Sequence, residues 1–96
     1  MSKIHSNYLK TNDDVELHYL QSGSGETIIM LPGAGFNAHL FKYQIEYFSQ
    51  NYDVISLDKR GHGKSEKVNY GYRTSRFGKD LDDLIRHLKL EKAFLI

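Results

Sequence analysis

The stretch Tyr52-Asp53-Val54-Ile55-Ser56-Leu57 runs directly into the octapeptide Asp58-Lys59-Arg60-Gly61-His62-Gly63-Lys64-Ser65. The first segment is mostly apolar and contains β-branched residues, a pattern typical of a strand. The second segment is polar and contains two glycines, which mark a loop. The sequence therefore predicts an inner strand over residues 52–57 that ends in a glycine-rich loop.

A second strand with the same kind of ending lies upstream, at residues 27–31. Thr27-Ile28-Ile29-Met30-Leu31 is a nearly continuous apolar run, as expected of a strand that is covered on both faces in a parallel sheet. The run is followed at once by Pro32-Gly33-Ala34-Gly35. This segment predicts another inner strand with a sharply punctuated end.

The N-terminal part of the chain predicts a β-hairpin. Residues 15–20 alternate apolar and polar side chains, which indicates a half-buried strand, and residues 8–10 are its expected partner. Ser22-Gly23-Ser24-Gly25 supplies a flexible turn after the strand. His18 falls on the polar side of the alternation, so its side chain is expected to point outward.

Two amphipathic helices are predicted between the strands, one beginning at Asn37 and the other at Thr74 or Ser75. These residue types cap helices well because their side-chain oxygens accept hydrogen bonds from the first free N–H groups. The predicted buried stripes comprise Phe41, Ile45 and Phe48 in the first helix, and Phe77, Leu81, Leu84, Ile85 and Leu88 in the second. Charged residues lie off the second stripe: Lys79, Asp80, Asp82, Asp83 and Arg86.

The order of these elements predicts an α/β fold: an antiparallel hairpin arm followed by β-α-β-α-β. Residues 92–96 form the last predicted inner strand. A chain that stops inside an apolar strand leaves that strand without the crossover that would cover it. We therefore expect residues 1–96 to be one partial domain, the N-terminal fragment of a larger one.

Composition excludes several classes of partner. The 96 residues contain 13 Lys and Arg against 12 Asp and Glu, a net charge of +1, and no long run of like charge. We therefore expect neither a nucleic-acid nor a membrane partner. The chain has no cysteine and no apolar leader at its start, so a cytoplasmic location without disulfides is the default expectation. Nothing in the composition calls for a cofactor.

One motif permits a dinucleotide-binding interpretation. The stretch Gly33-Ala34-Gly35-Phe36-Asn37-Ala38 satisfies G-x-G-x-x-[GA] between a predicted strand and a predicted helix. Asp58 follows 20 residues after Ala38, where such folds place an acidic ribose ligand. However, this interpretation requires neither the N-terminal hairpin nor the second glycine-rich loop, and isolated motif matches have a high false-positive rate.

Taken together, the two loops point to a known family. Leu31-Pro32-Gly33-Ala34-Gly35-Phe36 before a helix, followed by an Asp58–Ser65 octet of the form D-x-R-G-x-G-x-S, resembles the first half of an α/β-hydrolase. The resemblance covers nearly the whole chain, from residue 15 to residue 96. It implies an eight-stranded sheet and an enzyme, most simply a serine hydrolase, that acts on an ester, lactone, amide or similar small molecule through a covalent intermediate.

The resemblance assigns a role to the first loop. It makes the backbone N–H of Ala34 one donor of the oxyanion hole, which stabilises the alkoxide that develops during acyl transfer. Gly33 and Gly35 support that loop by letting the backbone turn and come close. Pro32 stands where many members carry His, which removes one bracing side chain but leaves the Ala34 N–H available.

The resemblance makes the second loop structural. Asp58, Arg60, Gly61, Gly63 and Ser65 are expected to brace the site and to take no part in the chemistry. Members carry the nucleophile in G-x-S-x-G, and its acid and His come later in the chain. None of the three is recognised here, so no catalytic residue is assigned and the chain alone is expected to be inactive.

No other residue replaces the missing triad. Ser65 lacks the closing glycine of an elbow, and His62, the only histidine near the expected site, has no nucleophile to serve. Another class of function therefore stays open, that of a non-catalytic interaction domain. Such a domain would pair with itself through its exposed edge strand.

Overall fold

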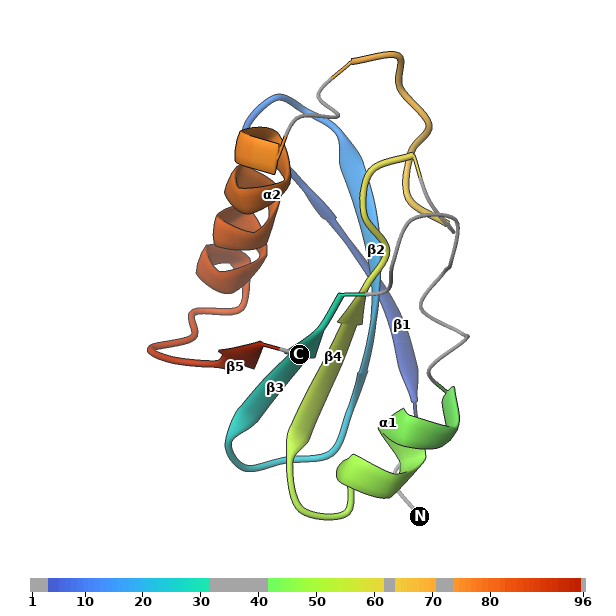
Figure 1. Ribbon diagram of the computed structural model, residues 1–96, viewed down its shortest axis with the longest axis vertical. Coiled ribbons are helices and arrows are strands. Elements are labelled where there is room, and N and C mark those ends of the chain that lie inside the picture. The colour runs from blue at the N-terminus through green and yellow to red at the C-terminus, as the bar shows by residue number, and fades with distance from the viewer. Residues whose placement is uncertain (1–3, 32–41, 62–63, 71–73, 96) are drawn as a thin grey trace.

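The computed structural model describes residues 4–31, 42–61, 64–70 and 74–95. These residues form one mixed sheet of five strands in the order β1-β2-β4-β3-β5. Helix α2 lies on one side of this sheet and helix α1 on the other (Figure 1). The predicted α/β class is confirmed.

The predicted hairpin is present and longer than expected. Strand β1 (His5–Lys10) pairs antiparallel with β2 (Glu16–Ser22), and Leu9 lies opposite Leu17. In the turn between them the N–H of Thr11 donates to the carbonyl of Val15, and Asp14 has a φ of 64°. Aspartate tolerates this left-handed conformation better than most residues, which suits it to the turn.

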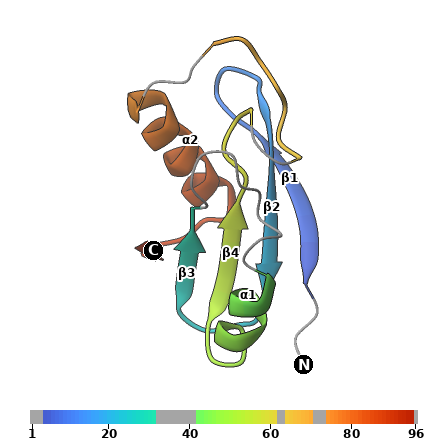
Figure 2. The same cartoon turned by 45° about the vertical axis from the view of Figure 1, so that its right-hand side comes forward.

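The inner strands follow the predicted order. Strand β3 (Thr27–Met30) runs parallel to β4 (Asp53–Leu57), whose other neighbour is the antiparallel strand β2. The short strand β5 (Phe94–Leu95) pairs parallel with β3. Figure 2 shows β3, β4, β2 and β1 in this order across the sheet. The hairpin arm is thus joined to a parallel β-α-β-α-β unit.

Both predicted helices exist, and their apolar residues face the sheet. Helix α1 (Lys42–Phe48) buries Ile45, whereas its predicted start at Asn37 and its predicted stripe residue Phe41 lie outside the described residues. Helix α2 (Thr74–His87) begins at the predicted Thr74 and buries Leu84 completely. The other predicted stripe residues of α2 and its C-terminal turn are partly buried: Phe77, Leu81, Ile85 and Leu88.

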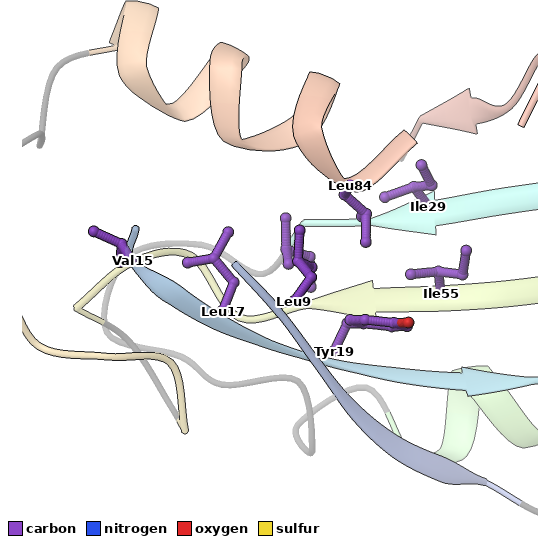
Figure 3. Close-up of a cluster of buried hydrophobic side chains, with 8 residues drawn as sticks. Leu9, Val15, Leu17, Tyr19, Ile29, Ile55 and Leu84 are labelled. Carbon is purple, nitrogen blue, oxygen red and sulfur yellow. The ribbon is translucent and has the colours of Figure 1, made fainter. Parts of the chain in front are cut away.

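Each face of the sheet has its own apolar core. The larger cluster lies under α2, and Figure 3 shows its side chains converging between the helix and the strands. Its buried members are Leu9, Val15, Leu17, Tyr19, Ile29, Ile55, Leu57 and Leu84. The smaller cluster lies under α1 and comprises Leu20, Ile28, Met30, Ile45 and Val54. Alternate residues of β2 and β4 therefore enter opposite cores, as the two-residue strand period requires.

The expectation that His18 points outward is wrong, because its side chain is completely buried. The alternation of β2 places His18 on the face opposite Leu17 correctly. That second face is covered locally, because Asp58 of the octet loop lies 2.8 Å from the His18 ring and the centre of the Tyr8 ring lies 5.1 Å from its centre. Asp80 of α2 differs from expectation in a similar way: it lies off the apolar stripe, yet it is only 2% exposed.

A close backbone approach fixes the turn after β2. Gly23 has a φ of 92°, and a Cβ built on it would lie 2.1 Å from the carbonyl oxygen of Tyr52 and 2.6 Å from that of Ser49. Both distances are far below van der Waals contact, so a larger residue would force the two segments apart. Gly78 contrasts with this position, because a Cβ there would meet nothing within 4 Å.

We therefore expect Gly23→Ala and Gly78→Ala to change stability in opposite directions. Gly23→Ala should lower the free energy of unfolding by at least about 1 kcal/mol, because alanine suits neither the positive φ nor the space. Gly78→Ala, within helix α2, should raise it by about 0.5–1 kcal/mol through helix propensity. Urea denaturation followed by circular dichroism measures both, and equal effects of the two changes would contradict the close approach.

Candidate functional site

The residues assigned to the oxyanion hole follow strand β3 directly. Met30 is the last residue of β3, and Leu31 is the last described residue before the loop. Gly33, Ala34 and Gly35 lie outside the described residues, so their role stays a prediction. What the structure does describe is the neighbouring loop, which begins at the carboxyl end of β4, the strand paired with β3. Ligands of α/β sheets bind at this edge.

The octet loop is attached to β2 by backbone hydrogen bonds. The N–H of Asp58 donates to the carbonyl of His18 at 2.9 Å, and the N–H of Glu66 donates to that of Glu16 at 2.8 Å. Gly61, with a φ of 77°, lets the chain reverse, and its own N–H donates to the carbonyl of Glu66 at 3.0 Å. The loop therefore continues the pairing of β4 with β2 beyond the end of the strand.

The Asp58 carboxylate is buried in the centre of this loop. Its Oδ2 lies 2.8 Å from His18 Nδ1 and accepts the N–H of Lys64 at 3.0 Å. The side chains of Asp58 and His18 are both 0% exposed. The Asp58 carboxylate is thus bound by His18 and by the backbone of Lys64 within the protein.

Ser65 is the last residue of the octet, and its hydroxyl forms hydrogen bonds with two backbone groups. Its hydroxyl donates to the carbonyl of Asp58 at 2.5 Å and accepts the N–H of His18 at 2.8 Å. A hydroxyl used in both directions and only 3% exposed is poorly suited to attack a substrate. These contacts agree with the bracing role that the resemblance implies for Ser65 and Asp58. His62 and Gly63 lie outside the described residues.

Arg60 ties this loop to two distant elements. Its guanidinium is 0% exposed and binds Asp80 of α2 through two hydrogen bonds, Nε to Oδ2 at 2.8 Å and one from a terminal nitrogen to Oδ1 at 2.7 Å. Two further hydrogen bonds of 3.0 Å reach Asp13 in the hairpin turn. These paired bonds match the planar fork of arginine to each carboxylate. The hairpin, the octet loop and α2 are thus joined by one buried cation.

The network extends along α2 to the surface. Arg76 contacts Asp80 at 2.9 Å and Asp83 at 3.2 Å, and Asp83 also accepts the backbone N–H of Asn12. Burial raises the pKa of the Asp83 carboxyl, but the Asn12 N–H and the Lys79 ammonium outweigh this effect, so the net shift of the pKa is downward. Helix α2 is therefore linked to the hairpin turn by the hydrogen bond from Asn12 to Asp83 and by an ion pair of 3.7 Å between Arg76 and Asp13.

The sequence analysis missed two residues of this network, Asp13 and the buried position of Asp80. No local signal identifies them. In the sequence, Asp13 has the pattern of an ordinary turn residue, and Asp80 is one of several charged residues of the predicted helix. The only available clue was a lone arginine in a glycine-rich loop, since a buried guanidinium requires carboxylate partners. Nothing in the sequence says which of the twelve acidic residues they are.

A cavity lies at the carboxyl ends of β3 and β4, next to α2. It has a volume of about 460 Å³, and its walls comprise Leu31, Leu57, Lys59, Phe77, Gly78, Asp80 and Leu81. The Lys59 ammonium stands 5.8 Å from the centre of the Phe77 ring, within range of a cation–π interaction.

Among the described residues, no group of three or more histidine and acidic side chains could hold a metal ion. Within the same residues, no helix is long and apolar enough to cross a membrane.

The Arg60 network predicts a defined loss of stability in acid. Hydrogen bonds from Arg60 are the main reason that the pKa of Asp13 falls from 3.8 to about 2. A carboxyl whose pKa is depressed in the folded state stabilises the fold above its unfolded pKa. This contribution, about 1–2 kcal/mol, is lost as the pH falls from about 4 to about 2.

Asp13→Asn should therefore reduce stability at pH 7 and flatten its pH dependence between about pH 4 and 2. Urea denaturation at a series of pH values measures this. The matched control is Asp14→Asn, because Asp14 is 84% exposed and paired only with Lys10 among the described contacts. An equal effect of both substitutions would show that Arg60 does not hold Asp13 as described.

Comparison with known proteins agrees with this architecture. A family model described as alpha/beta hydrolase fold matches residues 26–96. The chain is 34% identical over 95 residues to 3-oxoadipate enol-lactonase 2 of Acinetobacter baylyi, covering 97% of this chain and 36% of the lactonase. It is 32% identical over 94 residues to epoxide hydrolase 3 of Xenopus tropicalis, covering 93% of this chain and 26% of that protein.

Solved structures give the same result. The epoxide hydrolase CorEH superposes with a TM-score of 0.92 at 27% identity, covering 97% of this chain and 32% of that one. An esterase from Exiguobacterium antarcticum superposes with a TM-score of 0.90 at 29% identity, covering 95% and 34%. The chain thus spans about a third of the length of such proteins. By its sheet order and these matches, the chain belongs to the α/β-hydrolase fold family.

Proposed function

We propose that this chain is the N-terminal part of a hydrolase that acts on an ester, a lactone or a similar small molecule through a covalent intermediate. The observation that carries the proposal is the match to an enol-lactonase over 97% of this chain, together with the parallel pairing of β3 and β4. A shorter match is to another enzyme that is named as a hydrolase of a small molecule. Over 60 residues the chain is 43% identical to (E)-2-((N-methylformamido)methylene)succinate hydrolase of Acinetobacter baylyi, covering 62% of this chain and 23% of that enzyme.

In this proposal the chain supplies half of an oxyanion hole. The Ala34 N–H stabilises the negative charge that develops on the carbonyl oxygen of the substrate during attack. The second donor is the N–H of the residue that follows the nucleophile. We place the nucleophile, a serine, with its acid and its His in the other two thirds of the enzyme. An aspartate nucleophile would instead give the chemistry of epoxide hydrolases or dehalogenases.

The contacts of the octet loop support the proposed position of the oxyanion donor. Arg60 and its two aspartates, and Asp58 with His18, hold the octet loop rigidly beside the end of β3. A donor that must stay about 3 Å from a reacting oxygen needs a neighbouring backbone that does not move. The buried ions thereby serve catalysis by rigidity, without contact with the substrate.

This proposal predicts a division of activity between the chain and a longer protein. The 96-residue chain should show no sustained release of nitrophenolate from p-nitrophenyl acetate above a heat-denatured control. In the longer enzyme, Ala34→Pro removes the N–H donor and should lower kcat by about 10²–10³-fold. Ala34→Ser keeps the N–H and is the control. Equal rates for Ala34→Pro and the unchanged enzyme would remove Ala34 from the oxyanion hole.

A second candidate function is self-association, and one observation favours it. Strand β5 pairs only with β3 in the described part of the chain, and its Phe94 side chain is 55% exposed. Exposed strand edges with apolar side chains pair readily with another chain. We propose that two copies meet along β5, with Phe94 in the contact.

Phe94→Lys should therefore shift the sedimentation profile of the chain toward the monomer, because a charged side chain on an edge strand opposes pairing. Tyr47→Lys is the matched control, since Tyr47 is 69% exposed on helix α1, away from β5. A wild-type chain that stays monomeric at high concentration would exclude self-association. Loss of association in both variants would place the contact elsewhere.

A further inference from the structure

Three side chains far apart in the sequence form a continuous chain of hydrogen bonds. The Oγ of Ser6, on β1, lies 2.5 Å from Nε2 of His18, on β2. The Nδ1 of the same ring lies 2.8 Å from Oδ2 of Asp58, in the octet loop. The register explains the first contact, because Ser6 lies opposite Leu20 and is therefore a diagonal neighbour of His18 on one face of the hairpin. Figure 2 shows β1 beside β2 at the edge of the sheet.

The proton positions follow from the partners. An ionised carboxylate only accepts hydrogen bonds, so the His18 nitrogen that faces Asp58 carries the proton. The nitrogen that faces Ser6 then has a lone pair and accepts the serine hydroxyl. Asp58 is itself held by the N–H of Lys64, so the ring is fixed in this orientation. The arrangement is that of an activated nucleophile: the Ser6 hydroxyl faces a base, His18, which is oriented by the Asp58 carboxylate.

The proposed nucleophile is exposed, whereas the two residues that would activate it are buried. Ser6 is exposed, whereas His18 and Asp58 have fully buried side chains. The Tyr8 ring covers the imidazole, with its centre 5.1 Å from that of His18. An electrophile in solution can therefore approach Ser6, whereas the imidazole beside it is buried.

We propose that Ser6 is an activated nucleophile that accepts an acyl group from a small activated ester. In this step the Ser6 oxygen forms a bond to the acyl carbon, and its proton passes to Nε2 of His18. The bond from the acyl carbon to the leaving group breaks, and the leaving alcohol takes the proton back from His18. The Asp58 carboxylate stabilises the imidazolium that exists between these transfers.

The reaction at Ser6 is expected to be a slow modification of the chain itself. We assign no oxyanion donor to Ser6 among the described residues. Because each such donor contributes about 10²–10³-fold in rate, the reaction should be slow. The proposal uses none of the residues assigned to the oxyanion loop, Gly33, Ala34 and Gly35. The inference therefore does not depend on the proposed function.

The test uses the 96-residue chain and an alkyl fluorophosphonate, followed by intact mass and peptide mapping. The Ser6 oxygen should displace fluoride from phosphorus and give one stable adduct per chain. Labelling should be about 100-fold faster at Ser6 than at Ser24, an exposed serine in the turn after β2, because a positioned base contributes at least that much. Ser6→Ala should abolish this adduct, and Ser24→Ala should leave it unchanged.

A second measurement addresses the buried partner. His18→Gln should lower the labelling rate about 100-fold. Because a buried substitution can unfold the chain, the unchanged protein is also labelled across a urea series, where the rate at Ser6 should fall together with the circular dichroism signal. Labelling of Ser6 no faster than of Ser24, or labelling that survives unfolding, would overturn the proposal. Either result leaves the Ala34 test of the hydrolase proposal unaffected.

Discussion

The buried guanidinium of Arg60 is the constraint on which the rest of the structure depends. A cation with 0% exposure cannot be hydrated, so Asp80 and Asp13 must both be in place around it. Removing one partner from a buried ion pair typically costs about 3–5 kcal/mol, because the remaining charge stays buried without compensation. One side chain thereby decides how close the hairpin turn, the octet loop and helix α2 must lie.

The apolar cores and the polar network have different tasks in this fold. The two cores hold the helices against the sheet, but hydrophobic contact is non-directional and would tolerate small shifts of the loops. Paired hydrogen bonds from Arg60, and those from Lys64 and His18 to Asp58, are directional and therefore fix the position and orientation of the loop. A hydrolase needs this accuracy at the sheet edge, where the neighbouring loop is proposed to carry the Ala34 donor.

The His18 environment shows where sequence patterns stop being informative. The two-residue period of a strand correctly separates His18 from Leu17 and Tyr19. Whether the second face meets water depends on what packs over it, and Asp58 of the octet loop, which packs on His18, comes 40 residues later in the chain. The same limit applies to Asp80. A helical wheel places it beside the stripe, and only the position of Arg60 makes it a buried partner.

The sequence by itself determined the order of the elements, the hairpin, the strand ends and the family resemblance, because each rests on residues that are close in the chain. Periods of two and 3.6 residues, glycine-rich punctuation and the eight-residue Asp58–Ser65 motif are all local signals. Only the tertiary structure decided which acidic residues hold Arg60, and that His18 joins Ser6 to Asp58. Arg60 and Asp13 are 47 positions apart, and His18 and Asp58 are 40 apart. Charged and polar pairs across such distances leave no periodic trace, since any of several aspartates satisfies the same chemistry until the sheet brings one of them within hydrogen-bonding distance.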